Sequence, residues 1–228
     1  MAACYVEAIQ SVQSEGPYLL GGWSMGGEIA FEMAQQLHAR GQKVALLALL
    51  DARIPSAAEN VADEDFEAML MADVVRYFGL SSDFSQSLAL LPQDELLTRV
   101  LEQGKSAGLI PADIEASQAH RLIELCKSDF RASRNYMLHR YPGRVTLFKA
   151  SENLSGDIID PTLGWSDWAE GGVDVQIVPG NHATMVYKPN VETLAEKLAA
   201  SIEQVMLNLK CEGNTTIASS DESMKDSQ

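Results

Sequence analysis

Cysteine and basic residues are both scarce in this chain of 228 residues, and each scarcity disfavours a class of protein. The three cysteines, Cys4, Cys126 and Cys211, are odd in number and widely spaced. This argues against a disulfide framework or a zinc site and favours reduced thiols, so we expect a cytoplasmic location. The 17 lysines and arginines stand against 32 aspartates and glutamates, a formal net charge of −15. Because nucleic-acid binding needs clustered cations, that role is disfavoured, and an acidic partner would need a local basic patch.

Long apolar runs are also missing, and none reaches the length that spans a bilayer. The first residues, MAACYVEAIQ, lack the basic segment and apolar core of a signal peptide, so we expect no membrane partner. A hydrophobic content of 46% and a charged content of 21% are typical of a soluble globular protein. We place one domain at residues 1–208. Residues 209–228 are largely polar and lack aromatic side chains, which predicts a disordered tail.

Apolar periodicity predicts alternating helices and strands. The sequence favours a helix over residues 3–13, a buried strand at 17–23, a helix over 25–39 that stops at Gly41, and a second buried strand at 43–51. Strand, helix and strand in this order form a βαβ unit, which implies a parallel sheet with a right-handed crossover. Further strands at 143–150 and 173–180 and a last helix over 189–207 complete an α/β fold with a mostly parallel sheet.

A long helical insertion separates the second predicted strand from the third. Three helical stretches are predicted there, at 63–78, 93–104 and 112–139, with no strand pattern between them. Pro92 and Pro111 stand near the starts of the second and third stretches, where proline is tolerated.

The stretch Gly22-Trp23-Ser24-Met25-Gly26 fits the pattern G-x-S-x-G between a predicted strand and a predicted helix. A sharp turn there would hold Ser24 in a strained conformation, and we expect both glycines to be needed to avoid collisions. The turn would expose the Ser24 hydroxyl and place the Met25 N–H at the helix N-terminus, facing the oxygen that becomes negative in acyl transfer. We therefore predict Ser24 as a nucleophile and Met25 as an oxyanion donor.

A serine nucleophile needs a base, and the chain has only four histidines. His38, His120 and His139 fall within predicted helices. His182 instead lies in the loop VPGNHATMV, directly after the last strand and before the last helix. An α/β-hydrolase presents its base at that place, so we predict His182 as the base.

Three aspartates that follow predicted strands also satisfy the chain order of serine, acid and histidine. Asp51 ends the strand after the nucleophile helix, whereas Asp157 and Asp160 follow the next strand. In most α/β-hydrolases the acid follows the later strand, which favours Asp157 or Asp160. Asp51 lies most directly at the carboxyl edge of the sheet, where ligands bind in open parallel sheets.

Three blocks of the sequence resemble the thioesterase domains that end nonribosomal peptide synthetases and polyketide synthases. They are GPYLLGGWSMGGEIAFEMAQQL (16–37), LLALLDARIP (46–55) and LGWSDWAEGGVDVQIVPGNHATMV (163–186). The resemblance implies an α/β-hydrolase-like fold, with the nucleophile at Ser24, the base at His182 and the acid at Asp51 in preference to Asp160. It also implies a helical lid at roughly 56–130.

The chain departs from that family at its N-terminus. Several strands normally precede the nucleophile strand, and a turn among them supplies a second oxyanion donor. Here one short helix precedes it, so we expect the N-terminal strands to be missing and an exposed strand edge to remain. Losing one oxyanion donor lowers the rate on the order of 10²–10³ in a well-studied protease.

The resemblance implies a serine hydrolase of secondary-metabolite biosynthesis. It would release an acyl, peptidyl or polyketide chain from the phosphopantetheine thioester of a carrier protein, by hydrolysis or cyclisation, with no metal or cofactor of its own. Two alternatives stay open. One is a stand-alone carboxylesterase or lipase, and the other is a truncated, non-catalytic fragment that binds a carrier protein.

Overall fold

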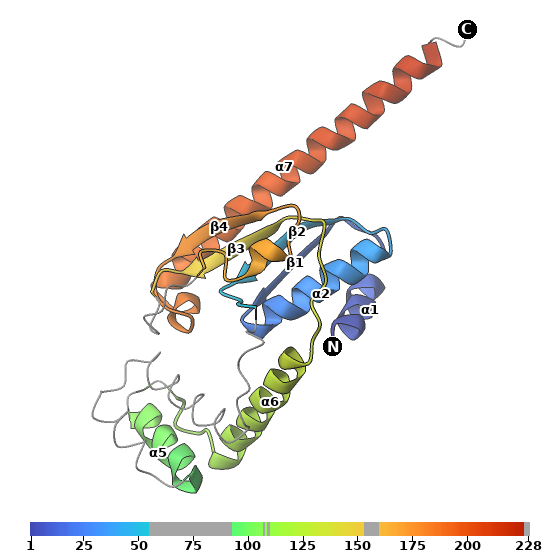
Figure 1. The fold of residues 1–228 in the computed structure, drawn as a ribbon. Helices are drawn as coiled ribbons and strands as arrows, with labels where there is room; N and C mark the ends of the chain where they lie inside the picture. Colours follow the sequence, from blue (N-terminus) through green and yellow to red (C-terminus); the bar gives the residue numbers. More distant parts are fainter. Residues whose placement is uncertain (55–92, 107, 109, 153–159, 226–228) are drawn as a thin grey trace.

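The structure is a computed structural model that describes residues 1–54, 93–106, 108, 110–152 and 160–225 (Figure 1). Its centre is a sheet of four parallel strands in the order β1-β2-β3-β4. The strands are β1 Tyr18–Trp23, β2 Val44–Leu50, β3 Val145–Ala150 and β4 Val173–Val178. The predicted α/β fold with a parallel sheet is confirmed.

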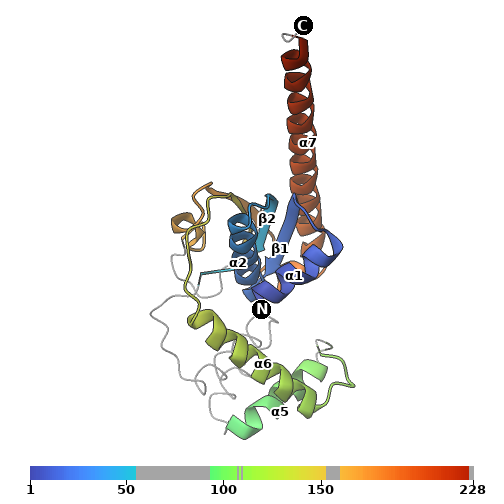
Figure 2. The same cartoon turned by 90° about the vertical axis from the view of Figure 1, so that its right-hand side faces the viewer.

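Helices cover both faces of the sheet. Helices α1 (Ala2–Val12) and α2 (Met25–Ala39) pack on one face, and α7 (Asn190–Lys225) packs on the other (Figures 1 and 2). Two further helices, α5 (Gln93–Ser106) and α6 (Ala116–Arg134), lie on the opposite side of the molecule from the free end of α7. Short 3-10 helices, η1 and η2, span Trp165–Asp167 and Thr184–Val186.

Strand β2 is buried on both faces because each face meets helices. Leu47 and Leu49 pack into a core with α1, α2 and η1, while Leu46 and Ala48 pack into a second core with α7. This two-sided burial explains why the strand's sequence is an unbroken apolar run.

Strand β1 lies at one edge of the described sheet and pairs with β2. Its burial alternates: Tyr18 and Leu20 are buried, whereas Leu19 is 43% exposed. The prediction that β1 is buried throughout is therefore wrong for one of its faces.

Helix α2 begins directly after Ser24 and buries a stripe that includes Ala30, Phe31, Ala34 and Leu37. It ends before Gly41, which has a φ of 72°. Glycine adopts this left-handed conformation without a steric penalty, so the predicted stop is confirmed.

The insertion agrees in part with the predicted lid. The predicted helix at 63–78 lies outside the described residues, and so does much of the range 56–130. The predicted second helix corresponds to α5. The third is shorter than expected, since α6 ends at Arg134 and leaves His139 outside it. None of the helices among the described residues combines the length and the apolar character that crossing a membrane requires.

The last helix differs most from the sequence prediction. Helix α7 runs to Lys225, so the structure replaces the expected disordered tail, 209–228, with helix over 209–225. Extending an existing helix adds one hydrogen bond for each residue fixed and needs no new nucleus. A polar sequence without proline can therefore continue a helix that packing has begun.

Candidate active site

Ser24 occupies a strained turn between β1 and α2. Its φ of 54° and ψ of −130° lie in a region that residues other than glycine rarely adopt. Its N–H donates to the Leu50 carbonyl at 3.0 Å, and its carbonyl accepts the Gly27 N–H at 2.9 Å. Such a conformation costs about 1–3 kcal/mol and persists because surrounding bonds fix it. The turn therefore presents the hydroxyl at the carboxyl end of β1.

Close backbone contacts explain some of the glycines around Ser24. A Cβ on Gly22 would lie 2.0 Å from the Gly26 carbonyl oxygen, so a side chain there is excluded. A Cβ on Gly26 would meet nothing within 4 Å, so the expected steric need for glycine there is wrong. Gly27, which the motif does not include, would place its Cβ 2.4 Å from that of Ala52. It lets α2 approach the residues that follow β2.

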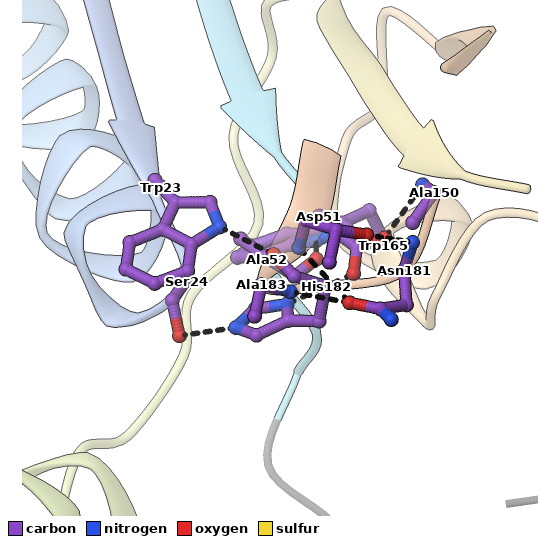
Figure 3. Close-up of polar contacts among 10 residues, drawn as sticks. Trp23, Ser24, Asp51, Ala52, Ala150, Trp165, Asn181, His182 and Ala183 are labelled. Atoms are coloured by element: carbon purple, nitrogen blue, oxygen red, sulfur yellow. Dashed lines mark hydrogen bonds and ion pairs between the residues drawn. The ribbon is translucent and has the colours of Figure 1, made fainter. Parts of the chain in front are cut away.

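His182 lies in the loop between β4 and η2, and its ring bridges two residues (Figure 3). Nε2 lies 3.1 Å from the Ser24 hydroxyl, and Nδ1 lies 2.9 Å from Oδ2 of Asp51. An ionised carboxylate can only accept, so Nδ1–H donates to Asp51 and Nε2 is left to accept from the serine. The tautomer is the one that a general base needs.

Asp51 follows β2 at a φ of 46°, a left-handed conformation that aspartate tolerates better than most residues. While Oδ2 faces His182, Oδ1 accepts the Ala150 N–H at 2.9 Å. The Asp51 N–H donates to the Phe148 carbonyl at 2.7 Å. The carboxylate is thus fixed from the end of the neighbouring strand, and its side chain is 14% exposed.

Asp160 has a different role in the structure. Its carboxylate accepts the Thr162 N–H, the Thr162 hydroxyl and the Gly164 N–H, at 2.8–2.9 Å. The Thr162 backbone bond contributes most to a pKa below the usual value for this carboxyl. Asp160 therefore organises the turn before η1. The aspartate that faces His182 is Asp51. Asp157 lies outside the described residues.

The other histidines contact different parts of the protein. His38 is on α2 and lies edge-on to Tyr141, His120 is exposed on α6, and His139 is exposed with Nδ1 near the Leu138 carbonyl. The serine, histidine and aspartate brought together are therefore Ser24, His182 and Asp51.

Met25 is the first residue of α2. The first N–H groups of a helix have no acceptor within it and carry the positive end of its dipole. Their location next to Ser24 suits an anion, although the role predicted for the Met25 N–H remains a prediction. The Met25 side chain also lines a cavity of about 300 Å³ between α1, α2 and residues 132–136.

Near this cavity, two acidic side chains of α2 accept hydrogen bonds from residues at and just after the C-terminal end of α6. The Ser133 hydroxyl donates to Glu28 at 2.6 Å, and the Tyr136 hydroxyl donates to Glu32. Burial raises the pKa of Glu28, an effect that the bond from Ser133 partly offsets. Glu28 is one helical turn beyond Ser24, so these bonds connect the insertion to the nucleophile helix.

A metal site would need several ligating side chains close together within the described ranges of the chain. Within those ranges, no group of three or more histidine, cysteine, aspartate or glutamate side chains could hold a metal ion. The chemistry available at the site is that of the three polar side chains: a hydroxyl, an imidazole that can take its proton, and a carboxylate that orients the imidazole.

A protein-family model described as "Thioesterase domain" matches residues 1–202, nearly the whole body of the fold. The chain belongs to this family. Thioesterase domains are hydrolases that act on thioesters, which is the class of enzyme that the sequence resemblance implies.

Curated relatives of this thioesterase domain are large synthases. Chondramide synthase cmdD of Chondromyces crocatus is 29% identical over 89% of the chain, which corresponds to 5% of that synthase. Non-reducing polyketide synthase crz7 of Cladonia metacorallifera is 27% identical over 90% of the chain, and atromentin synthetase greA of Suillus grevillei is 25% identical over 82%. The matches span 10% and 20% of those two proteins. The chain thus corresponds to a small part of each relative.

Solved structures agree with this assignment. The four-domain nonribosomal peptide synthetase AB3403 is similar over 87% of the chain and 15% of its own, with a TM-score of 0.66 and 27% identity. The NocB thioesterase domain, in a covalent complex with a fluorophosphonate nocardicin G analogue, matches 89% of the chain and 73% of its own. Its TM-score is 0.58 at 25% identity.

Sequence reasoning missed several residues that hold the site of this thioesterase domain. Trp23 contacts His182, the Trp165 indole N–H donates to the Ala52 carbonyl at 2.8 Å, and the Asn181 side chain accepts the N–H groups of Ala183 and Thr184 (Figure 3). An asparagine next to the histidine of a short loop is a recognisable turn signal. The two indole contacts join residues more than 100 positions apart, so no local pattern indicates them.

Proposed function

We propose that this thioesterase domain releases an acyl, peptidyl or polyketide chain from the phosphopantetheine thioester of a carrier protein, through an acyl-enzyme on Ser24. The observation that carries the proposal is the pair of contacts made by His182, 3.1 Å to the Ser24 hydroxyl and 2.9 Å to Asp51. This arrangement suits activation of a weak nucleophile by an oriented base.

In the proposed first half-reaction, His182 Nε2 takes the Ser24 proton as Oγ bonds to the thioester carbon. The carbon–sulfur bond then breaks, and the pantetheine thiolate leaves with the proton from His182. The Met25 N–H, at the start of α2, would stabilise the negative oxygen of the tetrahedral intermediate. Asp51 would stabilise the imidazolium without taking its proton.

In the second half-reaction, His182 removes a proton from the nucleophile that attacks the Ser24 ester. The bond between the acyl carbon and Ser24 Oγ then breaks, and His182 returns the proton to Oγ. Water would release a free acid, whereas an amine or hydroxyl of the acyl chain itself would release a ring. The domain needs no cofactor of its own, because the phosphopantetheine arrives on the carrier protein. A cytoplasmic location is part of the proposal, because three widely spaced cysteines favour reduced thiols.

The relatives support this choice of substrate. Curated matches include synthases of both the nonribosomal peptide and polyketide types. In the AB3403 match the similar segment belongs to a four-domain synthetase chain. These proteins make acyl-thioester release the natural hypothesis over the hydrolysis of free oxygen esters.

The test compares an acyl-pantetheine thioester with the matched oxygen ester, using the wild-type chain and Ser24→Ala. We expect faster turnover of the thioester and no turnover of either by the variant. Preference for the oxygen ester would favour the esterase alternative. Turnover of neither substrate, together with retained binding of an acyl carrier protein, would favour the non-catalytic alternative.

A further inference from the structure

Trp23, the residue directly before Ser24, contacts His182 in two separate ways. The indole and imidazole rings are stacked, with centroids 5.0 Å apart and planes inclined by 23°. The indole Nε1–H donates to the backbone carbonyl of His182 at 3.1 Å (Figure 3). One side chain therefore contacts both the ring and the main chain of the same residue.

Trp23 does not have the environment of a core tryptophan. It ends β1, the edge strand, and is 42% exposed, whereas Trp165 is fully buried. Burial therefore supplies little reason for a large aromatic side chain at this position, and its contacts with His182 supply a specific one.

We propose that Trp23 is a positioning residue that holds the His182 ring in line with Ser24 and stabilises its protonated form. The inference rests on the proposed function, because a protonated imidazole forms only if His182 accepts the serine proton. Trp23 would act through His182 without touching the reacting atoms.

The stacked contact favours the imidazolium over the neutral ring. A cation over an indole face within about 6 Å is attracted by the quadrupole of the aromatic system. The charge that appears on His182 when Ser24 loses its proton would therefore be stabilised from one face by Trp23 and from Nδ1 by Asp51.

The hydrogen bond from Trp23 restrains the loop in addition to the loop's own internal bonds. Asn181 and Thr184 tie the loop to itself through side chain to backbone bonds. The bond from Trp23 ties the His182 carbonyl to the end of β1, the strand that carries Ser24. It therefore fixes the base relative to the nucleophile.

The test measures the second-order rate constant for reaction with a fluorophosphonate probe against pH. Trp23→Leu removes both contacts, and Trp23→Phe keeps an aromatic face without the N–H. Trp168→Phe, at a partly buried tryptophan packed against the core around η1, is the matched control. The acidic residues on the neighbouring elements are the same in every variant. They are Asp51, which contacts the ring, Glu28 on α2, and Glu152, whose N–H donates to the Gly180 carbonyl beside the loop.

We expect Trp23→Leu to move the acidic limb of the profile to lower pH by about half a unit, because an exposed cation–π contact is worth roughly a factor of three. The plateau of this variant, which is the rate constant at pH values above the acidic limb, should fall on the order of ten-fold, because the hydrogen bond and the stacked contact are both lost. Trp23→Phe should lose about five-fold on the plateau, as expected for one hydrogen bond, and leave the limb close to wild type. The control should leave limb and plateau unchanged.

The outcomes separate this inference from the proposed function. Labelling that survives Ser24→Ala contradicts the proposed function. Labelling that needs Ser24 and His182, with identical limbs in wild type and Trp23→Leu, overturns the role of Trp23. A lower plateau with an unmoved limb in Trp23→Leu also overturns the stabilising role, since a structural defect alone gives that result. A histidine NMR titration, with the His182 signal assigned by His182→Gln, tests the same shift without any reaction: equal midpoints in wild type and Trp23→Leu contradict the inference.

Discussion

The carboxylate of Asp51 lies 2.9 Å from Nδ1 of His182, although 131 positions separate the two residues in the chain. Its second oxygen accepts the Ala150 N–H, so the group that orients the imidazole is itself held by the end of β3. The sheet therefore sets the direction of the base.

Asp51→Asn should lower the rate of reaction with a fluorophosphonate by about 10⁴, the size of the effect in a serine protease triad. An amide can present its NH₂ group to Nδ1, which would favour the tautomer with the proton on Nε2. Stopped-flow or gel-based labelling rates measure the loss. Asp160→Asn is the matched control, since that carboxylate organises the turn before η1. Equal losses in both variants would contradict the assignment.

The two glycines of the motif should differ in their tolerance of a methyl group. Gly22→Ala places a Cβ 2.0 Å from the Gly26 carbonyl, so we expect a loss of about 1–3 kcal/mol in the free energy of unfolding and loss of labelling. Gly26→Ala meets no atom within 4 Å and lies in α2, so it should raise stability by roughly 0.5–1 kcal/mol. Thermal unfolding of the two variants distinguishes them, and equal destabilisation would contradict the geometry.

Glu28→Gln should raise the melting temperature at neutral pH. Burial raises the pKa of Glu28, so between its ordinary and raised values the folded chain keeps a proton that the unfolded chain has lost. Stability from this group is therefore greatest below the ordinary value and is lost as pH rises through the raised one. The advantage of the variant should shrink towards acid pH.

The control for Glu28 is Glu196→Gln, at an exposed position of α7. It should not change the melting temperature in this way. An advantage of Glu28→Gln that does not depend on pH would contradict the proposed cause.

Tyr136→Phe should loosen the junction between α6 and α2. The Tyr136 hydroxyl donates to Glu32 and accepts from the Gln35 side chain. Burial is the largest cause of the raised pKa of the Tyr136 hydroxyl. The hydroxyl therefore remains a donor across the working pH range. Removing it leaves Glu32 without that donor, and we expect a loss of about 1.5–3 kcal/mol, the range for a bond to a charged group. Hydrogen exchange should quicken in α6, whereas Tyr5→Phe, at an exposed tyrosine of α1, should leave it unchanged.

Local patterns were sufficient for the elements that carry the site. The strand, helix and strand from Tyr18 to Leu50 match their predicted positions closely, because the apolar runs of the two strands and the glycine that stops α2 leave a clear signal in the sequence. The same reasoning selected Ser24 and His182 as candidates, since each follows a recognisable strand, and the structure brings their side chains together. The resemblance implied Asp51, but only the folded sheet places its carboxylate beside His182.

Long-range contacts explain what the sequence did not reveal. The bond from Trp23 to His182 spans 159 positions, and the burial of Trp165 against Ala52 depends on a turn held by Asp160. The steric reason for Gly27 requires knowing how closely α2 approaches Ala52. The polar composition of residues 209–225 predicted disorder, but these residues are helical, because propagation of an existing helix decides their structure and average polarity does not.

The most direct measurement is peptide mapping by mass spectrometry after reaction of the chain with a fluorophosphonate. We predict a single phosphonylated residue, Ser24, with labelling abolished in Ser24→Ala and His182→Ala and retained in His139→Ala. Modification at another residue, or undiminished labelling in His182→Ala, would contradict a nucleophile activated by the imidazole that lies 3.1 Å from it.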